Sequence, residues 1–512
     1  MIIAIAQHLL KGLVAGGGSS GWIGVPQSYI YKEMHQTAGQ MQMLQAASNS
    51  PWSLKPLFGL VSDLWPLGGY RKKYYILGVT VLAIPAYLVV WLGFSNFSWI
   101  DLKPNAANTT ICFFLMFLQI AVVDLLVEAQ YAERIRHHPN QGPSLITFVS
   151  TGLVACSMLS TVLAGFAVEY LPFGWIYFAS LLLIFPIIPP TWHNWLGEGV
   201  ITKPQAEPDE EKAKEEEEGK AKRGYIWFSV LLSVVAIGTA LLGVLKVRLE
   251  ITVAMVLLSI VLVIVALFQT VAPVVAKAAS FFFLQNVMGL RIDGAAFLFY
   301  TDTQEQYPEG PHFSPTFYIT ILGVVSGVFS LLGVAIYHRF LARIRYRQLF
   351  VIGNLISFVL GLSGIVVFGR WNLTMGMPDN WFVMGSGAIQ QSMAMLTWMP
   401  STIMISQLCP PRYEACTYAI VAGVMNLGTN MAQYLGAYLL QLLHVAPAGS
   451  KNESLQFTNL WLAALIASIF PCLVLLLVTR LIPDASPSQS LIIKEEKKEK
   501  EEKQKTEALA LN

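Results

Sequence analysis

The chain has 512 residues, of which 55% are hydrophobic and 12% are charged, and its formal net charge is +2. Soluble domains carry about 25% charged residues, so this composition excludes an ordinary soluble protein and indicates that lipid is the main solvent. The small net charge gives no reason to expect a nucleic-acid partner.

Apolar segments long enough to cross a bilayer recur along the chain. A hydrocarbon core about 30 Å thick needs roughly 20 apolar residues in a helix, and about fourteen segments meet this template. The first six are 3–29, 38–61, 75–92, 111–131, 145–168 and 175–188. The others are 226–245, 251–271, 278–300, 317–337, 349–368, 381–408, 415–443 and 460–478. The sequence therefore predicts an all-α polytopic membrane protein with about 14 transmembrane helices.

A charged tract near the middle, EPDEEKAKEEEEGKAKR, divides the chain into two halves. It is too hydrophilic to pack and is typical of a disordered linker. The predicted parts are an N-terminal six-helix bundle (1–192), an acidic cytoplasmic linker (193–224), two additional helices (225–272), a C-terminal six-helix bundle (273–482) and a cytoplasmic tail (483–512). We expect the two additional helices, which are poor in polar residues, to face lipid.

Two independent signals orient these helices. Lys and Arg in short loops stay in the cytoplasm, and placing both termini inside gives an inner-to-outer ratio of about two to one. Four glycosylation sequons then fall in outer loops, at Asn96, Asn108, Asn372 and Asn452. The sequence therefore predicts a multi-pass glycoprotein with both termini in the cytoplasm.

The two halves also share a motif, as expected of transporters built from paired bundles. Between the second and third segments an inner loop carries Gly59, Asp63, Gly69, Arg71 and Lys72, followed by Lys73. The equivalent place in the second half carries Gly333, Tyr337 and the basic run 345–347. This pattern resembles the loop signature of the major facilitator superfamily, in which we expect it to act in inner-side gating.

A longer resemblance is more specific. The run PWSLKPLFGLVSDLWPLGGYRKKYY at 51–75, the pair 123–124 with Glu128, and FLFYTDT at 297–303 resemble the folate-biopterin transporter family of the major facilitator superfamily. The resemblance covers nearly the whole chain outside the linker, the added helices and the tail. It implies the major facilitator fold, two six-helix bundles, and alternating access.

The same resemblance implies a function: import of folate or pterin compounds such as biopterin, with proton coupling, at the plasma membrane. It implies a small-molecule substrate, protons and the lipid bilayer as partners, and a monomer. It implies no enzyme activity and no cofactor. Carriage of another metabolite such as S-adenosylmethionine, an uncoupled facilitator and a membrane sensor stay open as alternatives.

Three charged residues are expected in one layer about 10 Å inside the cytoplasmic face, and a fourth one turn deeper, given a rise of about 1.5 Å per residue. Charges inside the membrane are costly and are functional candidates by default. The three are Lys11, Lys55 and Glu128, and the deeper residue is Asp124. Asp124 and Glu128 share a helix face because they are four residues apart.

We hypothesise that Asp124 and Glu128 form a proton-coupling site with Lys55 as counter-charge, since paired carboxylates in low dielectric can trap a proton. The alternative is structural: Glu128 pairs with Lys55 or Arg134 and holds the inner gate. Lys11 either acts directly or snorkels to the interface. Lys55 is also a candidate for contact with substrate.

Arg291 and Asp293 are expected near the bilayer midplane between two glycines. Residues two apart point to different helix faces, so either the helix is interrupted here or each charge has its own partner. Broken helices at the midplane are where transporters place substrate. Arg291 could bind the glutamyl carboxylate of folate and Asp293 a pterin amino group. The alternative is an internal ion pair that holds the two bundles together.

Further candidates for the substrate cavity are Gln390, Gln391 and Trp398, in a helix that is otherwise apolar. An aromatic ring there could stack on a pterin, although most aromatic residues in such chains face lipid or pack helices. No motif of metal-ligand spacing is present, so the predicted metal and cofactor content is none. Gly423, Gly428 and Gly436 are expected to allow close helix contact.

Overall fold

The computed structural model describes residues 8–16, 21–97, 103–137, 142–195, 198, 212–341, 343–408 and 414–486. Regular structure in these ranges is helical, apart from one isolated bridge between Leu67 and Tyr70. Among the described residues, ten helices are long and apolar enough to cross a membrane. The all-α polytopic class is therefore confirmed, whereas the number fourteen stays a prediction.

Within the described residues, the first half contains six helical segments, several of them broken. They are η1 (His8–Val14) with α2 (Gly24–Glu33), α3 (Ala38–Asn49) with η2 (Ser50–Leu54) and α4 (Lys55–Leu64), α5 (Lys73–Gly93), α6 (Ala106–His137), α7 (Gly142–Tyr170), and α8 (Phe173–Ile184) with η4 (Phe185–Ile187) and α9 (Ile188–Trp192). The start of α3 has a capping box, in which Thr37 and Gln40 satisfy each other's backbone N–H groups.

Two long helices and a second set of six follow. The long pair is α10 (Lys212–Val244) and α11 (Leu249–Thr270). The second set is α12 (Pro273–Met288) with α13 (Asp293–Thr301), η6 (Thr316–Ile321) with α14 (Leu322–Ile336) and η7 (Tyr337–Leu341), α15 (Tyr346–Phe368), α17 (Asp379–Leu408), α18 (Glu414–Leu442), and α19 (Leu460–Leu473) with η9 (Val474–Leu477) and α20 (Val478–Leu481). Short helices α16 (Trp371–Thr374) and η8 (Ser454–Phe457) lie in loops.

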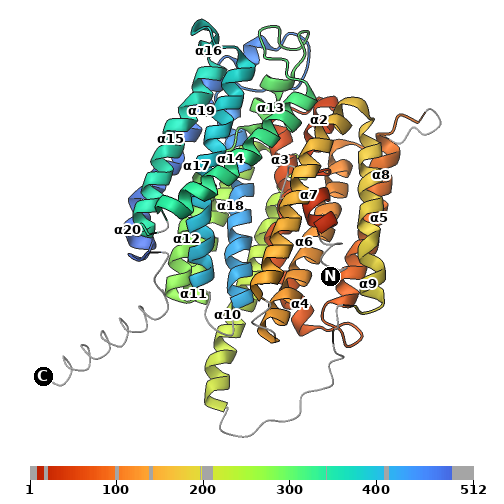
Figure 1. The fold of residues 1–512 in the computed structure, drawn as a ribbon, viewed down its shortest axis with the longest axis vertical. Helices are drawn as coiled ribbons and strands as arrows, with labels where there is room; N and C mark the ends of the chain where they lie inside the picture. Colours follow the sequence, from red (N-terminus) through yellow and green to blue (C-terminus); the bar gives the residue numbers. More distant parts are fainter. Residues whose placement is uncertain are drawn as a thin grey trace, which may run out of the picture.

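The two halves form bundles that stand side by side in Figure 1, the first in red to yellow and the second in green to blue. One end of the molecule carries α2, α13 and α16, and the opposite end carries α4, α9 and α20. Following the orientation predicted from the charges, we call these the outer end and the inner end. The arrangement places α3 and α18 at the seam between the bundles.

Close contacts join the bundles at this seam and at a second one. Along the α3–α18 seam, Gly39 meets Ala437, and the Ala38 N–H donates to the Pro447 carbonyl over 2.8 Å. Between α7 and η6, the Thr320 hydroxyl donates to the Val162 carbonyl over 2.9 Å. Because these contacts lie toward the outer end, the bundles meet there.

Helix α10 lies along the bundle seam, which corrects the expectation that the added pair only faces lipid. It packs against both α3 and α18. On the α18 side, the Tyr434 hydroxyl donates to the Thr239 carbonyl over 2.8 Å. Phe228 and Leu232 are fully buried. The helix also begins at Lys212, inside the segment predicted to be a linker. Helix periodicity gives α10 a buried stripe, which its average hydropathy conceals.

The four sequon asparagines differ in exposure. Asn96, Asn108 and Asn452 are exposed, whereas Asn372 is fully buried. The Asn372 amide nitrogen donates to the Asp379 carboxylate over 2.8 Å and to the Met377 carbonyl over 3.1 Å. A buried, bonded amide offers no nitrogen for a glycan.

We therefore expect the sequons to behave differently when each is kept alone. A variant that retains only Asn452 should gain a glycan, seen as a gel shift that a glycosidase removes. A variant that retains only Asn372 should show no shift, because its amide is enclosed. A glycan on the Asn372-only variant would contradict this arrangement of the loop.

Candidate functional site

Four charged side chains from three helices of the first bundle meet in one cluster. Lys11 comes from η1, Lys55 from the start of α4, and Asp124 and Glu128 from α6. The Lys11 ammonium lies 2.8 Å from Asp124 and 2.7 Å from Glu128. The Lys55 ammonium lies 2.6 Å from Asp124 and 4.0 Å from Glu128. The layer predicted from helix depth is thus a contact network, with Lys11 as a full member.

The network is electrically balanced, because two ammonium groups face two carboxylates. Asp124 is buried, with 1% of its side chain exposed, and both lysines contact it. Glu128 is 44% exposed. The Lys55 ammonium also lies 4.8 Å from the centre of the Trp52 ring, within range of a cation–π interaction. Asp124 therefore anchors the network, and Glu128 is its solvent-accessible member.

A separate charged pair, Arg291 and Asp293, lies where the first helix of the second bundle is interrupted. Helix α12 ends at Met288, α13 begins at Asp293, and the residues between them are not helical. This break confirms one of the two arrangements expected for Arg291 and Asp293. The break is separated from the outer end by α13, whose nine residues span about 13 Å at a rise of 1.5 Å per residue. The break is therefore near the middle of a 30 Å hydrocarbon core.

A break in a membrane helix leaves backbone groups without helical partners, and these are costly unless satisfied. Gln42 of α3, in the opposite bundle, satisfies two of them. Its side-chain nitrogen donates to the Arg291 carbonyl over 2.9 Å, and its side-chain oxygen accepts from the Gly294 N–H over 3.0 Å. The same nitrogen lies 3.2 Å from the Gln433 carbonyl of α18. Gln42 is fully buried and joins both bundles.

Glycine makes room for this arrangement. A Cβ on Gly436 of α18 would lie 1.7 Å from the Arg291 carbonyl oxygen, far inside contact distance. The Arg291 N–H donates to the Ala432 carbonyl of the same helix over 3.3 Å. The sequence predicted that Gly436 allows close helix contact, but it did not predict that the contacting segment is the backbone of Arg291. Gln42 was missed as well, although a glutamine in an apolar helix is a signal of a buried polar contact.

Arg291 and Asp293 pair with each other inside the break. The Arg291 Nε lies 2.7 Å from the Asp293 carboxylate, and the Gln433 amide donates to that carboxylate over 3.4 Å. The side chains are 46% and 50% exposed. This ion pair stays within one segment and does not cross from one bundle to the other. Both groups can therefore reach a ligand while they hold each other in place.

The three candidates of α17 separate onto different faces. Gln390 donates to the Leu360 carbonyl and the Ser363 hydroxyl of α15, so this exposed side chain links two helices of the second bundle. Gln391 and Trp398 are seven residues apart and share another face, and Trp398 is 55% exposed. The structure thus groups Trp398 with Gln391 but not with Gln390.

The inner-loop motif lies at the inner ends of α4 and α5. Gly69 has φ +82°, in the region that favours glycine. The Glu198 carboxylate accepts from the backbone N–H groups of Arg71, Lys72 and Lys73, at 2.7 to 3.2 Å. A carboxylate at a helix start satisfies free N–H groups and the helix dipole. Glu198 therefore ties the segment that follows α9 to this loop, a contact that the sequence did not predict.

Comparison with known proteins decides the family. The sequence profile described as the BT1 family matches residues 22–506. The chain belongs to the BT1 family. A folate-biopterin transporter of Synechocystis is 24% identical over 86% of this chain and 74% of its own length. Folate transporter 2 of Plasmodium falciparum is 23% identical over 92% of this chain and 86% of its own length.

Solved structures show the same fold at low identity. A POT family transporter in complex with 5-aminolevulinic acid has a TM-score of 0.61 at 13% identity, covering 94% of this chain and 96% of its own. A D-xylose-proton symporter has a TM-score of 0.58 at 11% identity, covering 95% and 98%. The protein is a multi-pass membrane transporter with the major facilitator fold, and it is not an enzyme.

Replacing the amide that supports the break should destabilise the protein. In Gln42→Leu, the Gly294 N–H and the Arg291 carbonyl lose their side-chain partner, at about 1–3 kcal/mol for each buried unsatisfied group. We expect a lower unfolding temperature in detergent and loss of transport. The matched control is Gln45→Leu, one turn further along α3, which removes a single bond to Ser28 within the first bundle. An equal effect of both substitutions would contradict the role of Gln42.

Proposed function

We propose that this protein is a secondary active carrier that imports folate or pterin compounds by alternating access, coupled to protons. The observation that carries the substrate class is the match to proteins named folate or folate-biopterin transporters along most of the chain. The structure supports it with a half-exposed guanidinium and carboxylate on a broken helix at the bundle seam. Paired bundles that rock about such a midplane site are the common architecture of secondary carriers.

The break offers groups that suit an anionic pterin conjugate. The Nε of Arg291 is engaged by Asp293, and the rest of the accessible guanidinium forms a planar fork for a glutamyl carboxylate. Asp293 can accept from the amino group and ring N–H of a pterin. Trp398 and Gln391 would stack on the ring and bond its edge, and Lys55 would contribute charge. Gln390 serves this site indirectly, by fixing α17 against α15.

The charged cluster supplies a means of coupling. With both lysines and both carboxylates ionised, its net charge is zero; a proton on Glu128 makes the net charge +1. Opposite charges in a low-dielectric site attract strongly, so the proton and an anionic substrate favour each other's binding. Within the proposed pair, Glu128 carries the mobile proton because it is accessible, and Asp124 holds the two lysines.

The remaining assignments follow from the same orientation. We place both termini in the cytoplasm, because basic residues in short loops stay on that side of the membrane. The family resemblance is the ground for placing the protein in the plasma membrane as a monomer. The motif at Gly59, Asp63, Gly69, Arg71 and Lys72 lies at that end and would act in closing it.

Uptake of labelled folate, biopterin and S-adenosylmethionine by cells that lack such carriers tests the function. We expect saturable uptake of folate or biopterin that a protonophore abolishes. Arg291→Gln should raise the KM for folate at least about tenfold, the cost of losing roughly 1.4 kcal/mol of charge-assisted bonding. The control is Arg248→Gln, an arginine that is 84% exposed at the outer surface.

Other results of the uptake experiment would support one of the alternative functions. Uptake of S-adenosylmethionine without uptake of folate or biopterin would show that the substrate is not a folate or pterin compound. Uptake that is insensitive to the protonophore would indicate a facilitator, and ligand binding without flux would indicate a sensor. An unchanged KM in Arg291→Gln would remove Arg291 from the site.

The proton step is tested with Glu128→Gln, which mimics the protonated side chain. We expect uptake that no longer rises as the outer pH falls, since the cluster is permanently at +1. The matched control Glu250→Gln neutralises a carboxylate that is 52% exposed at the outer surface, and should keep the wild-type pH dependence. Wild-type pH dependence in Glu128→Gln would contradict coupling at this residue.

A further inference from the structure

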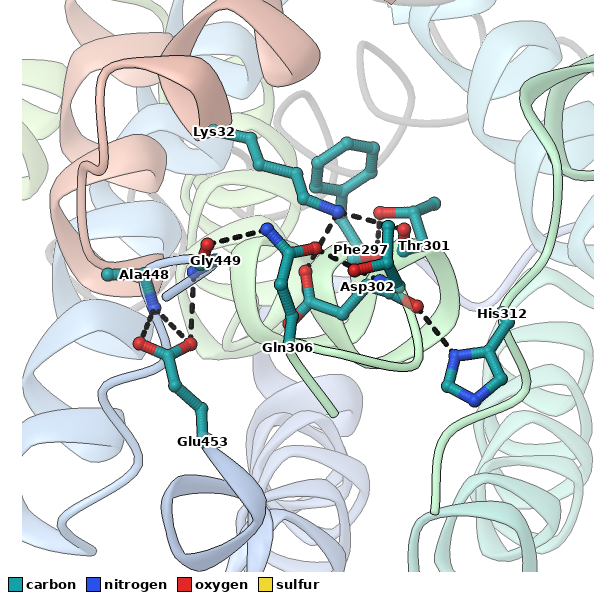
Figure 2. A network of polar contacts seen from close by, with 10 residues as sticks. Lys32, Phe297, Thr301, Asp302, Gln306, His312, Ala448, Gly449 and Glu453 are labelled. Carbon is teal, nitrogen blue, oxygen red and sulfur yellow. Dashed lines mark hydrogen bonds and ion pairs between the residues drawn. The ribbon is translucent and has the colours of Figure 1, made fainter. Parts of the chain in front are cut away.

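An ion pair closes the outer end between the two bundles. Lys32 lies in the last turn of α2, and Asp302 directly follows α13. The Lys32 ammonium lies 2.8 Å from the Asp302 carboxylate and donates to the Thr301 carbonyl over 2.8 Å. Figure 2 shows the lysine reaching across to the end of α13. Neither residue was singled out in the sequence beyond its place in a loop or a motif.

The pair is buried although it lies beyond the predicted membrane-spanning segments, which end at Tyr29 and Tyr300. The exposed fraction is 13% for the Lys32 side chain and zero for Asp302. Among the described residues, no hydrogen bond other than this ion pair reaches the Asp302 carboxylate oxygens. Directly beneath, Tyr29 of α2 packs edge-on against Phe297 of α13, with ring centres 4.8 Å apart. Charge and aromatic contact together seal the α2–α13 junction.

Asp302 is built into the second bundle. The loop that follows it is bound to the loop after α18, since the Gln306 amide donates to the Gly449 carbonyl over 2.5 Å and the Glu453 N–H donates to the Gln306 carbonyl over 2.8 Å. The Glu453 carboxylate accepts from the Ala448 and Gly449 N–H groups, both at 2.9 Å. Figure 2 shows these contacts beside the ion pair. Asp302 therefore moves with the second bundle and Lys32 with the first.

We propose that Lys32 and Asp302 form the outer gate of this transporter, an ion pair that is made when the outer end closes and broken each time it opens. The inference rests on the proposed alternating access, because that motion is what separates the two bundles at their outer ends. It needs no assumption about the identity of the substrate.

The energetics suit a contact that is broken in every cycle. Burial raises the pKa of the Asp302 carboxyl, against the opposing effect of the Lys32 ammonium. Burial also lowers the pKa of the Lys32 amine, against the opposing charge of Asp302. Both shifts mean that enclosing the charges has a cost, which their attraction only partly offsets. If one partner is removed, the other charge is left buried without a counter-charge, which is unfavourable. Opening of the outer end would expose that charge to water and so would be favoured.

A cysteine placed between the bundles reports the state of the gate. With the native cysteines replaced, a cysteine is introduced as Ala38→Cys at the bundle seam, where the parent alanine is fully buried. It should react slowly with a membrane-impermeant thiol reagent added outside. Lys32→Gln and Asp302→Asn should each raise the labelling rate at least about tenfold, a shift of 1.4 kcal/mol toward the open form. The exchange Lys32→Asp with Asp302→Lys should return the rate toward that of the parent.

The matched control is Lys451→Gln, which breaks an ion pair with Glu305 at 3.0 Å that is exposed and lies within the second bundle. Its labelling rate should equal that of the parent. Equal labelling of Lys32→Gln, Asp302→Asn and Lys451→Gln would overturn the gate.

If the neutral variants do not fold, Lys32→Arg keeps the charge and serves instead. It should label at the parent's rate and still transport, whereas faster labelling of this variant than of Lys451→Gln would overturn the ionic gate. Because labelling needs no substrate, failure of the folate assignment in the uptake panel leaves this result intact. Failure of the gate likewise leaves the uptake result intact.

Discussion

The two bundles of this transporter meet at a helix that has no regular hydrogen bonds at its centre. In lipid, an interrupted helix persists only where other protein groups satisfy its backbone. Here the Gln42 amide of the opposite bundle satisfies two backbone groups, and the Ala432 carbonyl accepts from the Arg291 N–H. The residues that the break presents, Arg291 and Asp293, thus depend on contact between bundles for their position. Any motion that separates α3 from the break also changes the geometry of the candidate binding site.

The internal repeat extends to how each half ends. In the first half, the Glu198 carboxylate after α9 binds the backbone N–H groups at the start of α5. In the second half, Asp484 after α20 lies 3.1 Å from Arg345, and the Ala485 carbonyl accepts from Tyr346 at the start of α15. Each half thus folds its last residues back onto its own basic loop. These contacts stay within each bundle, so they would persist during the proposed motion of one bundle against the other.

Hydropathy and charge spacing predicted the features that depend on local sequence. Helix class, the break around Arg291 as one of two alternatives, and the layer of Lys11, Lys55 and Glu128 follow from composition, flanking glycines and the helical rise. Contacts between distant segments did not follow, because no local pattern encodes the partner of Gln42 or Lys32. Likewise, the buried stripe of α10 is invisible in its mean hydropathy. The exposure of side chains was also not predicted from the sequence. Asn372 matches a sequon, yet its amide is enclosed by the loop that carries it.

The charged cluster around Asp124 and the ion pair of Lys32 and Asp302 complement each other. The cluster around Asp124 lies within one bundle, so its balance of charge survives the motion of the bundles and is changed only by a proton or a ligand. The pair of Lys32 and Asp302 lies between bundles, so its charges are balanced only while the outer end is closed. The proposed carrier, which would move an anion with a proton, needs both behaviours: one site that senses ligand charge in every conformation, and one contact whose energy depends on conformation alone. Placing them on different helices allows each to be altered by substitution without moving the other.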